Sequence, residues 1–207
     1  NTAIGDSALR SSNGIGNTAI GYVAADLLAT GDRNIIIGSG AVSTSLGCTD
    51  NIVIGAGAAP GLTGTLNTFI GTGANTSGNQ SESVGVGHFA LYQASGFGRN
   101  VAVGAYAGFG ITTGIQNTFI GESAGNNALQ AGNVIGSIAI GRGAYTTNSY
   151  QVVLGGPGIE DTRLYGPTRI YGTDGTGFGN LSCGSVTATR SLTGSQADSI
   201  LALSGTW

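Results

Sequence analysis

The chain is poor in charged residues. Asp, Glu, Lys and Arg make up 8% of its 207 residues, against about 25% in typical soluble domains. All seven basic residues are arginine, and there is no lysine and no methionine. A net charge of −3 does not provide the basic surface that nucleic-acid-binding proteins use, so we expect no nucleic-acid partner. No run of 18 apolar residues occurs, so we expect no membrane insertion.

Residues that commonly carry chemistry are also few. The single histidine, His88, has no placed cysteine or carboxylate partner with which to form a catalytic triad or a metal site. The adjacent Glu160 and Asp161 would point to opposite sides of an extended segment, so they would not converge on one glycosidic bond. The segment 173–180, TDGTGFGN, precedes no helix that could hold a phosphate and lacks the spaced carboxylates of a calcium loop. We therefore predict no catalytic, cofactor or metal site.

Glycine is abundant, with 40 residues, and its placement reveals a repeat. It does not recur at every third position, as collagen requires, and the many Ile and Val residues argue against a disordered linker. A glycine preceded by an aliphatic residue returns at intervals of 16 or 17 residues, with two late exceptions of 20 and 14. We call it the exit glycine because we expect it to end a strand; it stands at positions 5, 21, 38, 55, 71, 87, 104, 121, 141 and 155.

Other columns keep the same phase. Alanine stands three residues after the exit glycine in nine of ten units, and asparagine stands four residues before it in seven. The five-residue runs between these positions, such as NIIIG, are rich in β-branched residues and lie between turn-forming segments. Because the unit is too short for helical repeats or propeller blades, we predict an all-β fold: a parallel β-solenoid of about ten coils over residues 1–158. We expect the asparagines to form a hydrogen-bonded ladder between coils: Asn1, Asn17, Asn34, Asn51, Asn67, Asn100 and Asn117.

The alternation of side chains along each strand allows us to predict which residues face the inside of the coil and which face outward. We place the first and third strand residues inside the coil and the middle residue outside. The middle position is apolar or glycine in all ten units, and an uncovered apolar stripe of that length would be a liability. The stripe therefore predicts self-association, which we expect to be a parallel homotrimer, although the stripe alone is also compatible with a dimer. The candidate residues at the trimer axis are Ile36, Val53, Phe69, Phe119 and Val153.

Three further expectations follow from the straight solenoid. Cys48 and Cys183 would lie roughly 30 Å or more apart, beyond disulfide reach, so we predict free thiols. The threonines that share the first strand position, such as Thr18 and Thr68, could suggest ice binding, but isoleucine and valine interrupt the column and we place it in the core. Residues 159–207 abandon the repeat, and we predict a small β-rich connector or the start of a stalk there. We also expect the chain, which begins within the pattern at Asn1, to be a piece of a longer polypeptide.

The repeated segments resemble a known family. NTAIGDSA (1–8), NTFIGTGA (67–74), NTFIGESA (117–124) and SIAIGRGA (137–144) are similar to the head repeats of trimeric autotransporter adhesins, the YadA-like heads, and to repeats in bacteriophage tail fibres. The resemblance covers about residues 1–155 and implies a left-handed parallel β-roll with three chains around one axis. The period is longer than in adhesin heads, and residues 159–207 look like tail-fibre segments without heptads, so the phage form is favoured.

These observations predict a structural and receptor-binding segment of a trimeric phage tail fibre or virion appendage, located on the virion outside cells, and not an enzyme. A bacterial surface adhesin head is the alternative, and a glycan depolymerase is a further one. The partners would be other copies of the chain, other fibre or tail proteins, and a host surface glycan or protein. Receptor contacts are expected in loops; the aromatic candidates are Phe89, Tyr92, Phe97, Tyr106 and Phe109, whose other interpretation is packing between neighbouring coils.

Overall fold

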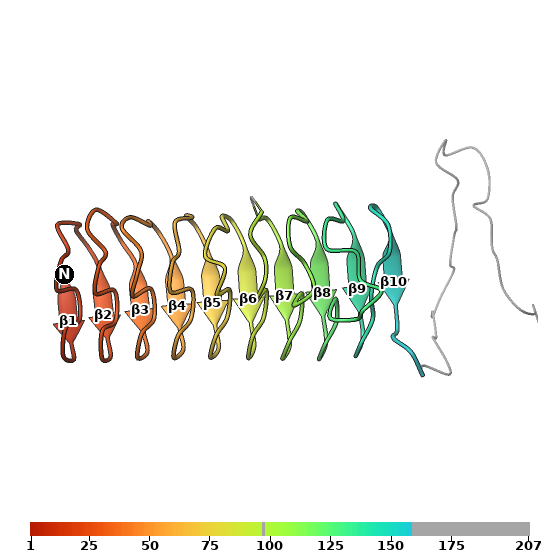
Figure 1. Ribbon diagram of the computed structural model, residues 1–207, viewed down its shortest axis with the longest axis horizontal. Coiled ribbons are helices and arrows are strands. Elements are labelled where there is room, and N and C mark those ends of the chain that lie inside the picture. The colour runs from red at the N-terminus through yellow and green to blue at the C-terminus, as the bar shows by residue number, and fades with distance from the viewer. Residues whose placement is uncertain (97, 159–207) are drawn as a thin grey trace, which may run out of the picture. The chain divides into compact units, whose positions relative to one another are not determined.

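The computed structural model describes residues 1–96 and 98–158, which form a parallel β-solenoid of about nine turns with no helix. Ten strands of three residues pair in chain order into one parallel sheet, and Figure 1 shows them side by side, each coil closing through loops at both ends of its strand. The strands are β1 (Thr2–Ile4), β2 (Thr18–Ile20), β3 (Ile35–Ile37), β4 (Ile52–Ile54), β5 (Thr68–Ile70), β6 (Val84–Val86), β7 (Val101–Val103), β8 (Thr118–Ile120), β9 (Ile138–Ile140) and β10 (Val152–Leu154).

The described residues confirm the predicted all-β parallel solenoid. Each strand pairs in register with the strand one repeat later, so that Ile36 of β3 lies opposite Val53 of β4. No helix long and apolar enough to cross a membrane occurs in the described part of the chain. The predicted module at 159–207, together with Glu160, Asp161 and Cys183, lies outside the described residues.

The turn after each strand explains the glycine and alanine columns. The exit glycine Gly38 has φ +139°, and a Cβ added there would overlap the carbonyl oxygen of Gly55 in the next coil. Glycine is therefore required both by the backbone conformation and by the close approach of neighbouring coils. The N–H of Ala41 then donates to the carbonyl oxygen of Gly38 at 3.2 Å, which closes a tight turn around a side chain that has no exposed surface.

The orientation predicted for the strands is wrong. The middle strand residues point into the coil of their own chain: Ile36, Val53, Phe69 and Phe119 have no exposed surface even in the isolated protomer. Val153 occupies the same column and is half-buried at the last described coil. These five residues therefore cannot line an axis shared with other chains.

The inward orientation of the middle strand residue follows from the alternation of side chains along the strand. Asn34 lies two residues before Ile36, and alternate residues of an extended segment share a face. The Asn34 side chain is fully buried beneath the turn that leads into the strand, so Ile36 is directed inward as well. The first and third residues, Ile35 and Ile37 in this coil, consequently face outward, and the threonines of the first column face outward with them.

The interior is filled by matching large residues with small ones on adjacent coils. Phe69 and Phe119 are the largest fully buried side chains. Phe69 lies beside Gly85, where an added Cβ would come within 3.1 Å of the Phe69 Cδ1 atom. Phe119 is opposite Ala102 and Ala139 on its two neighbouring strands. Each of these two phenylalanines is thus followed by glycine or alanine at the same position of the next coil.

Candidate functional site

The asparagine column forms a buried ladder along the solenoid. The Oδ1 atom of Asn17 accepts hydrogen bonds from the backbone N–H and the Nδ2 of Asn34, at 2.9 Å and 3.0 Å. The Nδ2 of Asn34 also donates to the carbonyl oxygen of Cys48 at 2.8 Å. Each buried amide therefore has partners in its own coil and in the next, which removes the cost of burying it and fixes the stacking register.

Serine replaces asparagine at position 83, and a residue that the sequence reasoning missed takes over the amide role. Gln80 is fully buried, and its Oε1 accepts from the Ser83 Oγ at 3.1 Å and from the Asn100 Nδ2 at 3.3 Å. Its Nε2 donates to the carbonyl oxygen of Gly96. The sequence feature that could have identified Gln80 is its position three residues before Ser83, the first position at which the asparagine column is interrupted.

Ion pairs connect neighbouring coils at the solenoid surface. Arg33 and Asp50 approach to 2.6 Å, and Arg99 and Glu82 to 3.2 Å. The hydrogen bond from the Arg33 guanidinium lowers the pKa of the Asp50 carboxyl below its ordinary value. Both pairs are exposed, so they contribute little to stability beyond favouring one register.

Clustered metal ligands do not occur among residues 1–96 and 98–158. No three of the His, Cys, Asp or Glu side chains in this part of the chain gather as a metal ion would require. His88 is exposed and its ring lies 3.9 Å from that of Phe89 and 5.3 Å from that of Tyr106, so its neighbours are aromatic rings.

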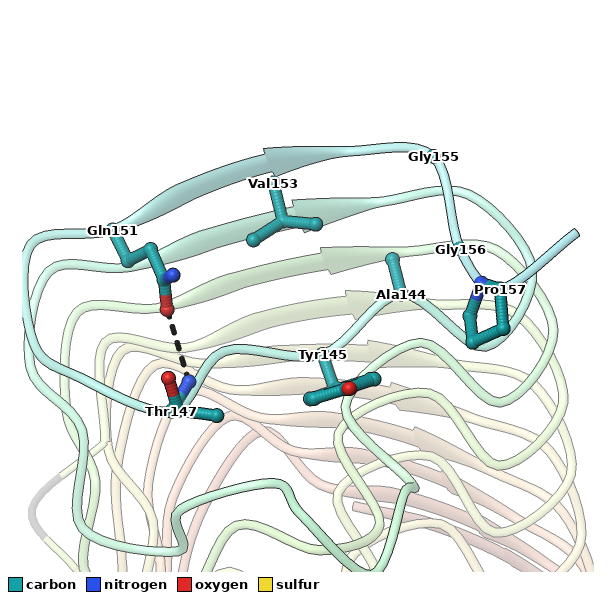
Figure 2. A pocket seen from close by; sticks show the side chains of 8 residues that line it. All are labelled: Ala144, Tyr145, Thr147, Gln151, Val153, Gly155, Gly156 and Pro157. Atoms are coloured by element: carbon teal, nitrogen blue, oxygen red, sulfur yellow. Dashed lines mark hydrogen bonds between the residues drawn. The ribbon is translucent and has the colours of Figure 1, made fainter. Parts of the chain in front are cut away.

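A hollow of about 510 Å³ lies at the last described coil, and Figure 2 shows the side chains around it. Val153 belongs to the middle-strand column that is buried in β2 to β9, so the hollow is the coil interior at β10. The Thr147 N–H donates to the Gln151 Oε1 at 2.9 Å across one side. The position of this hollow therefore has a structural explanation. Its lining residues are Ala144, Tyr145, Thr147, Gln151, Val153, Gly155, Gly156 and Pro157.

The outward columns of the sheet form an apolar surface, which we call the strand face. It consists of the first and third residues of the ten strands, twenty side chains of which four are threonine and none is charged. Ile35 is 42% exposed and Ile70 is 37% exposed. In the third column nine of the ten residues are Ile or Val, and Leu154 completes it. A continuous row of aliphatic residues that are partly or largely exposed is unusual on a protein that stays monomeric.

A second surface feature joins two coils on the turn that follows the strand. We call it the aromatic array: His88, Phe89 and Tyr92 after β6, and Tyr106 and Phe109 after β7. The rings of Tyr92 and Phe109 are parallel, with an interplanar angle of 1° and centroids 5.0 Å apart. Phe89 lies 4.9 Å from Tyr92 and 5.6 Å from Tyr106.

The structure thus brings together four of the five predicted receptor-contact residues. Phe89, Tyr92, Tyr106 and Phe109 are all half-buried, and they pack on one another across the two coils. The fifth, Phe97, lies outside the described residues. The expectation that they contact a receptor stays a prediction.

Comparison with protein-family models, with curated proteins and with solved structures finds no match to this chain.

Proposed function

We propose that this chain is a rod-like, adhesive segment of a trimeric fibre, of the kind found in bacteriophage tails or other virion appendages. Three solenoids would run parallel, with their strand faces turned toward a common axis. The fibre would act outside cells, attached to other fibre or tail proteins and presenting loops to a host-surface glycan or protein. The role is mechanical and adhesive and requires no catalytic group or cofactor.

The observation that supports self-association is the strand face. Its aliphatic side chains lie on the outside of the solenoid, where they contact their neighbours along the sheet but are left partly exposed by the protomer itself. Strands that are apolar on both faces are usually buried on both faces. Three narrow stripes of this kind can close around an axis and remove the exposed surface together, which favours the trimer over a dimer.

The assignment to a phage rather than to a bacterial surface rests on the repeat period and on the tail-fibre character of residues 159–207. A full-length chain with a heptad stalk and a membrane anchor after the solenoid would favour the bacterial adhesin head instead. The depolymerase alternative predicts that host polysaccharide is shortened on incubation with the protein, which our proposal does not.

The assembly is tested by sedimentation equilibrium. We expect a mass of three times 20.3 kDa for the chain. The double variant Ile70→Asp/Ile120→Asp places two carboxylates on the strand face and is expected to dissociate the assembly, because burying unpaired charges is costly. The matched control Ser39→Asp/Ala56→Asp adds the same charges at exposed turn positions, where Asp6 occurs naturally in the first coil, and is expected to keep the trimeric mass.

A wild-type mass of 20.3 kDa would contradict the proposal, and a dimeric mass would contradict the three-chain axis. An assembly that persists in the Ile70→Asp/Ile120→Asp variant would show that a different surface holds the chains together.

A further inference from the structure

We propose that the aromatic array is a binding platform for a neutral oligosaccharide. This inference deepens the adhesive part of the proposed function and rests on it. It assigns the ligand class and the place of contact: the rings of Phe89, Tyr92, Tyr106 and Phe109, with His88 beside them.

Comparison of the array with the same positions in other coils tests whether the aromatic rings are needed for packing of the solenoid. The array occupies the second and fifth positions after the exit glycine in two adjacent coils. In the other coils from β1 to β9 the same positions hold small, polar or aliphatic residues, and the same turn forms. The solenoid therefore does not need rings at these positions. The equivalents are Ser7 and Arg10, Val23 and Asp26, Gly40 and Ser43, Gly57 and Pro60, Gly73 and Thr76, Ser123 and Asn126, and Gly143 and Thr146.

The backbone is left-handed at the second position after the exit glycine in every coil from β1 to β9. Phe89 has φ +54° and Tyr106 has φ +58°, a left-handed conformation that bulky residues rarely adopt. Four other coils place glycine at this position, where the conformation is free of strain. Ser7, Val23 and Ser123 adopt the same conformation in other coils, with φ of 58°, 48° and 55°, so the left-handed turn is a property of the repeat and not of the aromatic array alone.

The rings are held in place by their surroundings. A Cβ added at Gly73 would overlap the Phe89 ring, so the missing side chain at Gly73 is what allows that ring to lie against the preceding coil. Tyr92 and Phe109 stack in parallel, and Tyr106 lies 5.9 Å from Phe109. All four residues remain partly exposed. The array is therefore a preorganised aromatic surface, which lowers the ordering cost of binding.

The chemistry around the array favours a neutral sugar. Pyranose rings have an apolar C–H face that matches an aromatic face, and hydroxyl groups at the edge that require polar partners. The first and fifth positions after the exit glycine, where the array has His88 and Tyr92, hold Thr72 and Thr76 in the preceding coil and Glu122 and Asn126 in the following coil. These residues offer hydroxyl, carboxylate and amide groups and include no arginine or lysine, which favours a neutral ligand over an anionic polymer.

The spacing also suits an extended chain of sugars. The array repeats along the solenoid axis with the coil rise of about 4.8 Å, a length comparable to that between successive sugar rings of an extended glycan. An oligosaccharide lying along the solenoid axis would therefore contact residues of both coils.

The test uses the assembled chain and a panel of neutral hexasaccharides: maltohexaose, cellohexaose, mannohexaose and chitohexaose. Titration calorimetry and ligand-observed NMR measure binding, with heparin as an anionic comparison. We expect at least one neutral hexasaccharide to bind and heparin not to bind. The replacement variant Phe89→Gly/Tyr92→Thr/Tyr106→Ser/Phe109→Asn takes each new residue from the equivalent position in an adjoining coil, and we expect it to weaken binding at least tenfold.

Sedimentation of the same samples separates this inference from the proposed assembly. We expect the replacement variant to keep the wild-type mass. A variant that loses glycan binding because its chains dissociate would overturn the array as a glycan site and make it part of the contact between copies. Absence of binding by all four neutral hexasaccharides at 10 mM, or equal binding by wild type and variant, would also overturn it. A monomeric wild type that binds the glycan through the array would contradict the fibre proposal and leave the array supported.

Discussion

The Nδ2 of Asn100 donates a hydrogen bond to the Oε1 of Gln80 at 3.3 Å, across a coil in which Ser83 replaces the ladder asparagine. Gln80 also accepts from the Ser83 hydroxyl and donates to the carbonyl oxygen of Gly96. One buried side chain thus keeps the amide ladder continuous where the repeat departs from its own pattern. Gln80 therefore contributes more to the stability of the solenoid than expected for a polar residue in a turn.

Gln80→Leu is therefore expected to destabilise the solenoid by about 2–4 kcal/mol, because it leaves several buried polar groups without partners. The midpoint of urea denaturation, followed by circular dichroism, measures the change. Gln93→Leu, at an exposed glutamine of the next turn, is the control and should shift the midpoint little.

The second variant Gln80→Leu/Ser83→Asn restores the ladder amide at its usual position. We expect it to recover a large part of the lost stability, since an asparagine at 83 can accept from the backbone N–H and the Nδ2 of Asn100 as the other ladder residues do for their neighbours. An equal midpoint for Gln80→Leu and wild type would show that the Gln80 hydrogen bonds contribute nothing.

The sequence predicted the coil well because its strongest columns reflect backbone requirements. The close approach of adjacent coils requires glycine at the exit position, and the narrow interior requires alanine three residues later. Both columns can be recognised from their regular spacing in the sequence. The face of the strand was predicted wrongly because both faces are apolar, so hydrophobicity could not choose between them. Asn34 and Ile36 are two residues apart and therefore share a face of the strand. This relation shows which face is inside only once the asparagine is known to be buried.

Size matching in the core predicts the outcome of a substitution at Gly85. Gly85→Val adds two methyl groups beyond a Cβ that would already lie 3.1 Å from the Phe69 Cδ1, so we expect a loss of about 1–3 kcal/mol. The compensating variant Phe69→Val/Gly85→Val gives both coils the residue that Val53 places at the same position, and should regain stability in thermal unfolding. A single variant as stable as wild type would contradict the tight packing between these residues.

The candidate sites were less predictable than the fold. The sequence identified the aromatic residues as a group, since four of them recur one repeat apart. Their pairing, Phe89 with Tyr106 and Tyr92 with Phe109, follows from the repeat alignment, but the parallel stacking of the second pair depends on side-chain torsions. The positive φ of Phe89 follows from its position only when the glycines of other coils are aligned with it.

Two neighbouring glycines allow a matched test of the stacking geometry. Gly55 has φ +145°, and an added Cβ would overlap the carbonyl oxygen of Gly71; Gly57 has φ +59° with open space around an added Cβ. We expect Gly55→Ala to destabilise the solenoid by more than 3 kcal/mol or to prevent folding, and Gly57→Ala to cost about 1–2 kcal/mol, the cost of a left-handed conformation. Thermal unfolding compares the two, and equal effects would show that backbone conformation alone, without close approach, governs the exit position.

Burial of Cys48 predicts slow thiol chemistry and a loss of stability at high pH. Removal from solvent raises the pKa of the thiol to about 11 from its ordinary value of 9.0, so at pH 8 the folded chain holds about 100-fold less thiolate than the unfolded chain. In a Cys183→Ser background, we expect a maleimide to modify Cys48 at least 100-fold more slowly in buffer than in 8 M urea. Because the unfolded thiol ionises first, the thiol's contribution to stability is intact below pH 9 and is lost as the pH rises toward 11, by an amount on the order of 2 kcal/mol. The Cys48→Ala/Cys183→Ser variant should lack this part of the pH dependence, and modification at equal rates in buffer and in urea would contradict the burial of Cys48.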